Sequence, residues 1–334
     1  MIDQPALPPS NTDLIVGAGE WVAAGHRVAL AIVIATWGSS PRPVGSVMVV
    51  RDDNHVAGSV SGGCVESAVI AAALDSLNEN IGRRLDFGIS DDTAWGLGLS
   101  CGGKISVLIS PIADTGIPEA VLAELCSNAG ARNVIRIILN AENGRLEPEA
   151  ASHPEAASHP DHDHLIGAKL DQQACRFYFV QMPPPRLIII GGGHIAQFLA
   201  PIAGLAGYDV SVIDPRAMFL TEARFPGIKM ICHWPQDALP QVTMDPQTAV
   251  VALTHDPKID DVALSAALAS EAGYIAALGS RRTHAARCER LRQAGFLEAD
   301  LVRIHGPAGL DIGAMTPAEI AVSILAQMIE ISKR

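Results

Sequence analysis

The sequence predicts an α/β protein in which a smaller, mixed α+β domain precedes a Rossmann-like, doubly wound parallel sheet. The chain has 334 residues, 49% of them hydrophobic, which is enough for two cores. After residue 186 the expected strands and helices alternate regularly, whereas before it they do not. The proline run in Met182–Arg186 separates the two patterns. We therefore expect domains at residues 1–182 and 183–334.

The charge and the amino-terminal segment exclude several classes of protein. A net charge of −12 argues against a nucleic-acid surface and against binding to anionic membranes. The segment MIDQPALPPSNTD has neither a basic stretch nor an apolar core, so no secretory signal is expected. Leu187–Tyr208 lacks Asp, Glu, Lys and Arg, but a glycine turn in its first third excludes a membrane span. We expect a cytoplasmic protein with reduced cysteines.

The amino-terminal half mixes helices and strands in irregular order. Periodicity and turn residues predict the helices Asp13–Gly25, Cys64–Leu77 and Pro118–Asn128, and the strands Arg27–Trp37, Val47–Arg51, Arg83–Ile89, Lys104–Ser110, Asn133–Leu139 and Cys175–Gln181. Because no strand–helix–strand rhythm connects these elements, an α+β arrangement is expected.

Two cysteines in this half stand beside glycine pairs, in Gly62-Gly63-Cys64 and in Cys101-Gly102-Gly103. Such a thiol is typically held on a loop, whereas most other cysteines of the chain are expected to be small buried residues. Cys64 is predicted at the start of a helix, where the partial positive charge favours the thiolate. The structural alternative is tight packing of these thiols against the glycines.

A histidine-rich segment near residues 150–165 interrupts the pattern of expected elements. AASHPE is followed directly by AASHPD, which brings together His153, His159, His162 and His164. A histidine-rich tract can bind a metal. Its duplication and its alanine and proline content favour a surface loop without fixed geometry, and we expect the loop.

The stretch Leu187–Arg216 predicts the strand, glycine turn, helix and strand of a Rossmann unit. Gly191, Gly193 and Ala196 match G-x-G-x-x-G/A, in which the glycines permit a tight turn and a close approach to a phosphate. The helix that follows directs its amino-terminal end at that phosphate. Asp214 ends the second strand, where a carboxylate can bind a ribose hydroxyl.

The rest of this half continues the alternation. We expect strands at Lys229–Cys232, Thr248–Leu253 and Tyr274–Leu278, and helices at Ile259–Glu271 and Thr283–Ala294. The final helix should begin with a capping box formed by Thr316 and Glu319.

Polar residues follow the ends of these strands, where open parallel sheets bind ligands. They are Gly191, Gly193 and His194 after the first strand, Asp214 and Arg216 after the second, His255 after the fourth, and Ser280 and Arg281 after the fifth. Cations, histidines and small residues on one edge suit an anionic, phosphate-bearing ligand. Taken singly, each has a bland alternative, such as a helix cap or a solvated charge.

Several segments together resemble one family. They are ATWGSSPRPVGS, GSVSGGCVE and LGLSCGG in the first half, and GGGHIA, VIDPR, THD, GSRRTHAAR and HGPAGLDIGAMTPAEIAVSILAQMI in the second. They are similar to the XdhC/CoxI family, the xanthine dehydrogenase accessory proteins. The likeness runs from about residue 17 to 329 and breaks only between residues 140 and 175.

The resemblance implies a chaperone for the molybdenum cofactor and not an enzyme. Such a protein binds molybdopterin with its metal, protects it while a cysteine desulfurase supplies a sulfido ligand, and passes it to an apo xanthine dehydrogenase-type hydroxylase. The motif residues Gly62, Gly63, Cys64, Cys101 and Gly102 are then cofactor contacts, and the Rossmann turn holds a phosphate. A Cys64 thiolate would be a soft ligand for the metal.

A second interpretation is an NAD(P)-dependent oxidoreductase that uses the glycine turn and Asp214. Its acid or base would have to be His194 or His255, and it leaves Cys64 and Cys101 unexplained. A nucleotide on the Rossmann turn is also compatible with the fold. We further expect a homodimer, because a small first domain should expose apolar surface.

Overall fold

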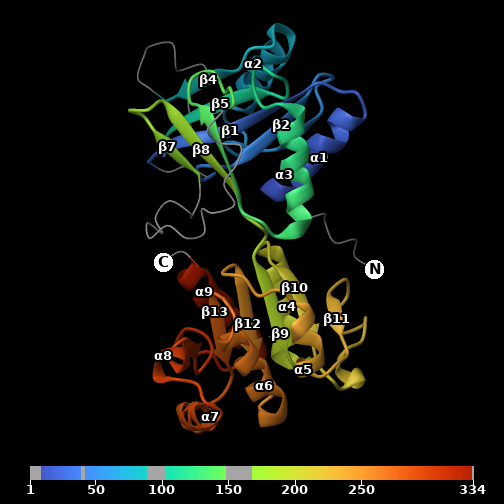
Figure 1. The fold of residues 1–334 in the computed structure, drawn as a ribbon, viewed down its shortest axis with the longest axis vertical. Coiled ribbons are helices and arrows are strands. Elements are labelled where there is room, and N and C mark those ends of the chain that lie inside the picture. The colour runs from blue at the N-terminus through green and yellow to red at the C-terminus, as the bar shows by residue number, and fades with distance from the viewer. Residues whose placement is uncertain (1–8, 39–41, 89–102, 148–167, 333–334) are drawn as a thin grey trace. The chain divides into compact units, whose positions relative to one another are not determined.

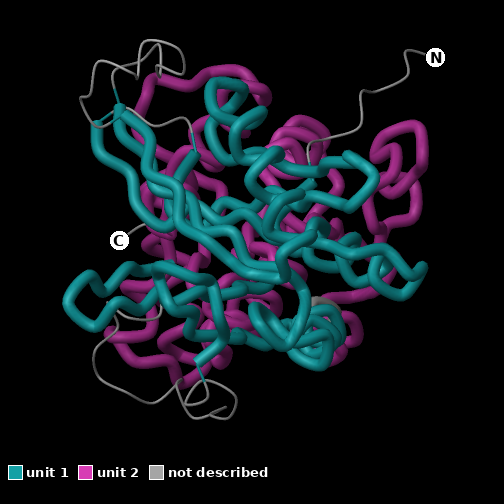
Figure 2. Tube along the Cα trace, turned by 90° about the horizontal axis from the view of Figure 1, so that it is seen from above, with its two compact units in different colours: residues 1–183 teal, residues 184–334 magenta. Residues whose placement is uncertain are grey.

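The computed structural model describes residues 9–38, 42–88, 103–147 and 168–332. The chain forms two compact units, Met1–Pro183 and Pro184–Arg334 (Figure 2). Unit 1 contains antiparallel sheets and unit 2 a parallel sheet, so the expected α/β class with a mixed first part is confirmed. Among the described residues, no helix is both long and apolar enough to cross a membrane.

The larger sheet of unit 1 has the order β3-β2-β1-β5-β4, with every neighbouring pair antiparallel. Its strands are β1 (Val28–Trp37), β2 (Val47–Arg51), β3 (Val56–Gly58), β4 (Arg83–Phe87) and β5 (Lys104–Pro111). Along β1, Leu30 and Ile32 join one core while Ala31 and Val33 join the other. Because successive side chains of a strand point to opposite faces of the sheet, β1 contributes to the core on each face.

Helices cover both faces of that sheet. α2 (Glu66–Glu79) contributes Val69 and Ala73 to one core, whereas α1 (Asn11–Ala23) and α3 (Glu119–Ala131) contribute to the other. A smaller sheet of order β6-β8-β7 adds Phe177 and Phe179 to the core on the side of α1. Its strands are β6 (Ile135–Asn140), β7 (Lys169–Asp171) and β8 (Arg176–Gln181).

Unit 2 is one six-stranded parallel sheet of order β11-β10-β9-β12-β13-β14. Figure 1 labels its strands β9 to β13. The strands are β9 (Arg186–Ile190), β10 (Asp209–Ile213), β11 (Lys229–Ile231), β12 (Thr248–Ala252), β13 (Tyr274–Ala277) and β14 (Ile304–His305). Numbered within the unit, the order is 3-2-1-4-5-6, that of a dinucleotide-binding Rossmann fold. β10 and β11 follow on one side of β9, whereas β12, β13 and β14 follow on its other side, so the strand order switches direction at β9.

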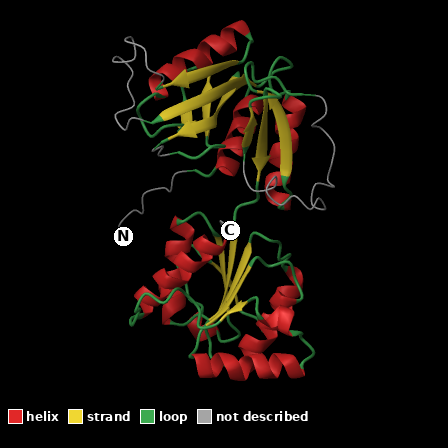
Figure 3. Cartoon of the chain, turned by 90° about the vertical axis from the view of Figure 1, so that its left-hand side faces the viewer, coloured by secondary structure: helices red, strands yellow, loops and turns green. Residues whose placement is uncertain are grey.

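Helices lie on both sides of this sheet, as Figure 3 shows, so the doubly wound prediction is confirmed. The helical segments are α4 (His194–Leu205), η5 (Ala217–Phe219), α5 (Pro235–Ala238), η6 (Leu239–Gln241), α6 (Pro257–Leu268), α7 (Arg281–Gln293), α8 (Glu298–Leu301) and α9 (Pro317–Ser332). α4 and α9 pack with Leu187 and Ile189 of β9, while α6 packs with Ile188 and Ile190.

Several boundaries differ from those that the sequence predicts. α2 begins at Glu66 and not at Cys64. The short elements β7, β14, α5 and α8 were not expected, since segments of two to four residues carry too little periodicity to be recognised. The capping box before α9 is confirmed, because Glu319 N donates to Thr316 Oγ1 and Thr316 N to the Glu319 carboxylate.

Candidate cofactor-binding site

The loop that carries Cys64 is organised by Glu66. We call residues 59–65 the Cys64 loop. The Glu66 carboxylate accepts hydrogen bonds from the hydroxyls of Ser59 and Ser61 and from the amides of Ser61 (2.8 Å), Gly62 (3.0 Å), Gly63 (2.8 Å) and Val65 (3.2 Å). The Cys64 amide donates to Ser61 Oγ at 3.1 Å. One side chain therefore fixes the whole loop.

These contacts keep Glu66 ionised. Burial alone would raise its pKa, but the hydrogen bonds from Ser61 and Ser59 lower the pKa to about 2. The Gly62 and Gly63 amides donate to this carboxylate, and the expectation that these residues contact the cofactor stays a prediction. Cys64 itself is exposed on the loop, two residues before α2.

The second glycine-flanked cysteine cannot be placed in the same way. Cys101 and Gly102 lie outside the described residues, and so does the histidine-rich segment near residues 150–165. In the described ranges, no three His, Cys, Asp or Glu side chains gather closely enough to hold a metal ion.

The Rossmann turn, Gly191–Gly193, joins β9 to α4. Gly191 has φ +104°, and a Cβ there would lie 2.5 Å from Thr254 Cγ2, so this position requires glycine. Gly193 caps α4, and a Cβ on it would meet no atom within 4 Å. His194 is the first residue of α4 and is exposed. The turn is therefore closed at Gly191 against Thr254, in the turn that follows β12, and open at Gly193.

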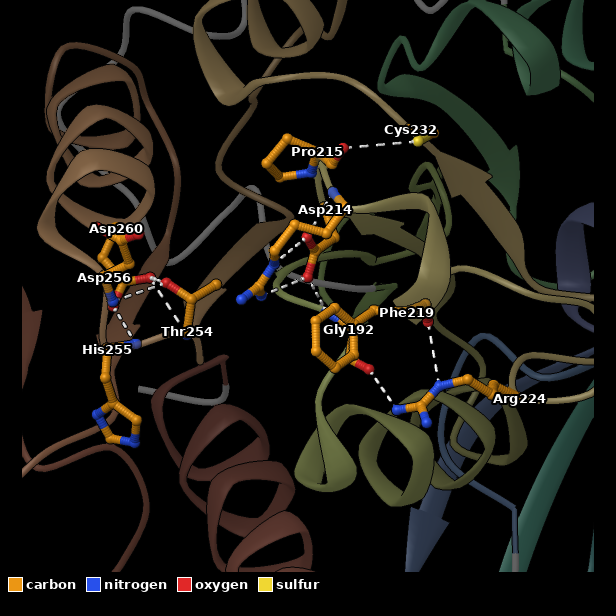
Figure 4. Close-up of polar contacts among 11 residues, drawn as sticks. Gly192, Asp214, Pro215, Phe219, Arg224, Cys232, Thr254, His255, Asp256 and Asp260 are labelled. Atoms are coloured by element: carbon orange, nitrogen blue, oxygen red, sulfur yellow. Dashed lines mark hydrogen bonds and ion pairs between the residues drawn. The ribbon is translucent and has the colours of Figure 1, made fainter.

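Asp214 lies at the end of β10, as predicted, but is fully buried. One carboxylate oxygen accepts from Gly192 N (2.9 Å) and Arg216 Nη2 (2.8 Å), the other from the Arg216 amide and Nε (both 2.9 Å) (Figure 4). Burial would raise its pKa, yet the bonds from Arg216 and Gly192 lower it. Because the chain itself saturates this carboxylate, the structure does not support a role in binding ribose.

A segment after β10 covers the Rossmann turn, and we call residues 215–225 the strap. The Arg224 guanidinium donates to Phe219 O (3.1 Å) and to Gly192 O (2.7 Å) (Figure 4). The Phe219 ring lies 4.4 Å from the Arg216 guanidinium and 5.6 Å from that of Arg224. A Cβ on Gly192 would come within 2.8 Å of Phe219 O. Neither Phe219 nor Arg224 could be recognised from the sequence, because no periodic pattern marks an irregular segment.

The buried carboxylate of Asp260 stabilises the turn that follows β12. Asp260 accepts from Thr254 Oγ1 at 2.6 Å and from the His255 amide at 2.9 Å (Figure 4). His255 has φ +65° and is exposed. The buried Arg287 lies 3.9 Å from Asp260 and donates to Leu278 O at 2.9 Å. Burial raises the pKa of Asp260.

The turn after β13 carries the last predicted contacts. Ser280 caps α7, since its Oγ accepts from the Thr283 amide at 3.1 Å. Arg281 follows as the first residue of α7 and is exposed. The sheet order β10-β9-β12-β13 places the four turns side by side at the carboxyl edge of unit 2. Arg216, His194, His255 and Arg281 supply side chains there that suit an anion.

A further exposed thiol at this edge was not expected. Cys232 follows β11 directly, is exposed, and has its Sγ 3.9 Å from Pro215 O (Figure 4). Cys126, Cys175 and Cys288 are partly buried. The sequence does not separate Cys232 from these three, because it predicts Cys232 as the last residue of a strand, whereas the strand ends at Ile231.

The second unit is a Rossmann-type binding domain, as its sheet order, its glycine turn and the side chains at its carboxyl edge indicate. It is joined to a mixed domain. Comparison with known proteins gives the family. Residues 187–328 match the model of the XdhC Rossmann domain, and residues 21–88 match that of the XdhC and CoxI family. The chain belongs to the XdhC and CoxI family, as the resemblance predicts.

Two curated relatives and one crystal structure are similar over nearly the whole chain. A Bacillus subtilis protein named as a probable xanthine dehydrogenase subunit is 30% identical, over 92% of this chain and 94% of that protein. The "Molybdenum cofactor insertion chaperone PaoD" of Escherichia coli is 28% identical, with 98% and 91% covered. A crystal structure of a xanthine dehydrogenase from Bacillus halodurans superposes with a TM-score of 0.71 at 27% identity, covering 96% of both chains.

Proposed function

We propose that this protein binds the molybdenum cofactor as cargo, protects it during sulfuration and assists its insertion into a xanthine dehydrogenase-type hydroxylase. The observation that carries the proposal is the exposed thiol of Cys64 on a loop fixed by Glu66. A thiolate is a soft donor of the kind that a molybdenum centre accepts. The similarity to a relative named as a molybdenum cofactor insertion chaperone supports the same assignment.

Candidate cofactor contacts are proposed within each unit by itself. In unit 1, Cys64 contacts the metal, and Cys101 with its glycine neighbours contributes further contacts. In unit 2, the carboxyl-edge cations and the open face at Gly193 suit an anionic group such as a phosphate. The residues of unit 2 proposed for this role are Gly191, Gly193, His194, Arg216, His255, Ser280 and Arg281.

The partners follow from the same proposal. They are the apo hydroxylase that receives the cofactor and the cysteine desulfurase that supplies sulfur. In this proposal the chain forms a homodimer and binds both partners in the cytoplasm. The protein acts as a carrier and not as a catalyst. An NAD(P)-dependent oxidoreductase is disfavoured, because Asp214 is buried and already accepts bonds from Gly192 and Arg216.

Molybdenum content tests the proposal. We expect Cys64→Ala, produced in cells that make the cofactor, to carry molybdenum at a level lower by about tenfold or more. Elemental analysis of the purified protein measures this. Cys232→Ala removes the other exposed thiol described and should retain the metal. Undiminished molybdenum in Cys64→Ala, with the fold intact by circular dichroism, contradicts the proposal.

Binding of the anionic end of the cofactor at the Rossmann turn is tested separately. A side chain at Gly193 would enter the open space at the amino-terminal end of α4 without touching the protein. Gly193→Val should therefore weaken pterin binding, measured by fluorescence of the released pterin, while leaving the fold unchanged. Equal pterin content in wild type and variant would remove the Rossmann turn from the site.

A further inference from the structure

The Cys64 loop has the composition of an anion-binding loop but does not offer its amides. Glycine-rich loops bind phosphates because successive backbone N–H groups point at the ligand. Here the amides of Ser61, Gly62 and Gly63 point instead at the Glu66 carboxylate, at 2.8 to 3.0 Å. The chain supplies its own anion where a ligand's anion would bind.

The charge of this internal anion is not neutralised by an ion pair within the described residues. Its partners are hydroxyls and amides, which stabilise the ionised carboxylate without cancelling its charge. A cation, Arg42, contacts the start of the loop, where its Nε donates to Ser59 O at 3.1 Å and not to Glu66. The negative charge therefore lies two residues from Cys64, with a cation bound to the start of the loop.

We propose that Glu66 is the specificity-determining residue of the Cys64 loop: it fills the loop's own anion site, so that Cys64 receives a thiophilic metal centre and anions are disfavoured there. This inference rests on the proposed function and deepens it. It assigns the anionic end of the cargo to residues other than the Gly62 and Gly63 amides.

The alternative to a specificity role is a purely structural role for Glu66, and the experiment has to distinguish the two. An acidic residue in the first turn of a helix stabilises that helix whatever lies beside it. Loss of such a role would change how exposed or ordered Cys64 is, and would affect all thiol reagents alike. A specificity role changes the preference between reagents of different charge.

Alkylation by two reagents of nearly equal size measures that preference. Iodoacetamide is neutral and iodoacetate is anionic, and both react with the same thiolate. The ratio of their rates at one cysteine therefore cancels the thiolate fraction and the accessibility. Mass spectrometry of peptides from the full chain gives this ratio for Cys64 and Cys232 in one experiment.

Glu66→Gln keeps an oxygen acceptor but removes the charge. At low salt we expect the iodoacetamide-to-iodoacetate ratio at Cys64 to fall by about threefold to tenfold in this variant, and the ratio at Cys232 to stay unchanged. Arg42→Gln should move the Cys64 ratio in the opposite direction. Glu66→Asp keeps the charge, so its ratio should stay within about twofold of wild type even if both rates change.

The wild-type protein provides a test that does not depend on how a variant folds. Raising the salt from about 0.01 M to 1 M shortens the screening length from about 30 Å to 3 Å, so the wild-type ratio at Cys64 should fall towards that of Glu66→Gln. A Cys64 ratio that neither Glu66→Gln nor salt lowers overturns the inference. These measurements need no molybdenum, so they fail or succeed independently of the metal content of Cys64→Ala.

Discussion

The Cys64 loop and the Rossmann turn solve the same problem in different ways. In each, a glycine amide donates to a carboxylate of the chain itself: Gly62 and Gly63 donate to Glu66, and Gly192 donates to Asp214. Glu66 is three residues from Gly63, keeps part of its surface exposed and has hydroxyl and amide partners. Asp214 comes from the next strand, is fully buried and is paired with Arg216. Hydroxyl and amide partners leave the negative charge of Glu66 on the Cys64 loop, whereas Arg216 neutralises the charge of Asp214 at the Rossmann turn.

Removing Asp214 should give the largest effect. Asp214→Ala leaves the Gly192 amide and the Arg216 guanidinium without their acceptor, so we expect the free energy of unfolding to fall by about 3 kcal/mol. Urea denaturation followed by circular dichroism measures the loss. Asp209→Ala on the same strand is the control, because Asp209 is about half exposed and lies 3.5 Å from Arg186. It should cost under about 0.5 kcal/mol. Equal losses in the two variants would mean that the buried pair contributes nothing special.

The next largest loss of stability is expected for a substitution at Gly191, the first residue of the Rossmann turn, and a smaller one at Gly193, its last residue. Gly191→Ala forces a Cβ to within 2.5 Å of Thr254 Cγ2 at φ +104°, and we expect a loss of about 2 kcal/mol. Gly193→Ala has open space and φ −71°, so it should cost only the ordinary penalty of alanine at an N-cap, about 0.5 to 1 kcal/mol. Thermal denaturation of both variants checks this. A tolerated alanine at residue 191 would show that the turn can relax away from β12.

Glu66→Gln should lower stability less than Asp214→Ala or Gly191→Ala, and its effect should depend on pH. The pKa of Glu66 is lowered from 4.5 to about 2, so its stabilisation is complete above about pH 4.5 and is lost as the pH falls towards about 2. Because the side chain is partly exposed, we expect wild type to exceed the variant by only about 1 kcal/mol at pH 6. Denaturation of both proteins at pH 6, 4 and 3 measures the difference. A gap that stays constant over this range would contradict the assigned pKa.

The sequence predicts the fold better than the site. Four apolar residues before three glycines predict β9 and the Rossmann turn, because both faces of a central parallel strand are buried. The pattern places Asp214 correctly at the end of β10. The alternative that Asp214 caps a turn with Arg216, two residues on, is confirmed. The sequence does not reveal the bond from Gly192, because that residue is distant from Asp214 in sequence.

The role of Glu66 in the Cys64 loop is missed for a related physical reason. An acidic residue after GGC is consistent with a helix that starts at Cys64, and the stabilising charge at a helix start is the same whether Glu66 points outwards or back into the loop. Only the structure shows that it turns back to Ser59, Ser61 and the glycines, which delays the helix to Glu66. Cys232 is similar, because exposure after a three-residue strand leaves no periodic trace.

The close contact between Gly191 and Thr254 has a consequence for how such chains are classified. A glycine at this point is demanded by the close approach of Thr254, in the turn after β12, and would be required whether or not the Rossmann turn binds a nucleotide. Surveys that count nucleotide-binding proteins by this fingerprint alone would include the chain, although the acidic residue that follows its second strand is buried.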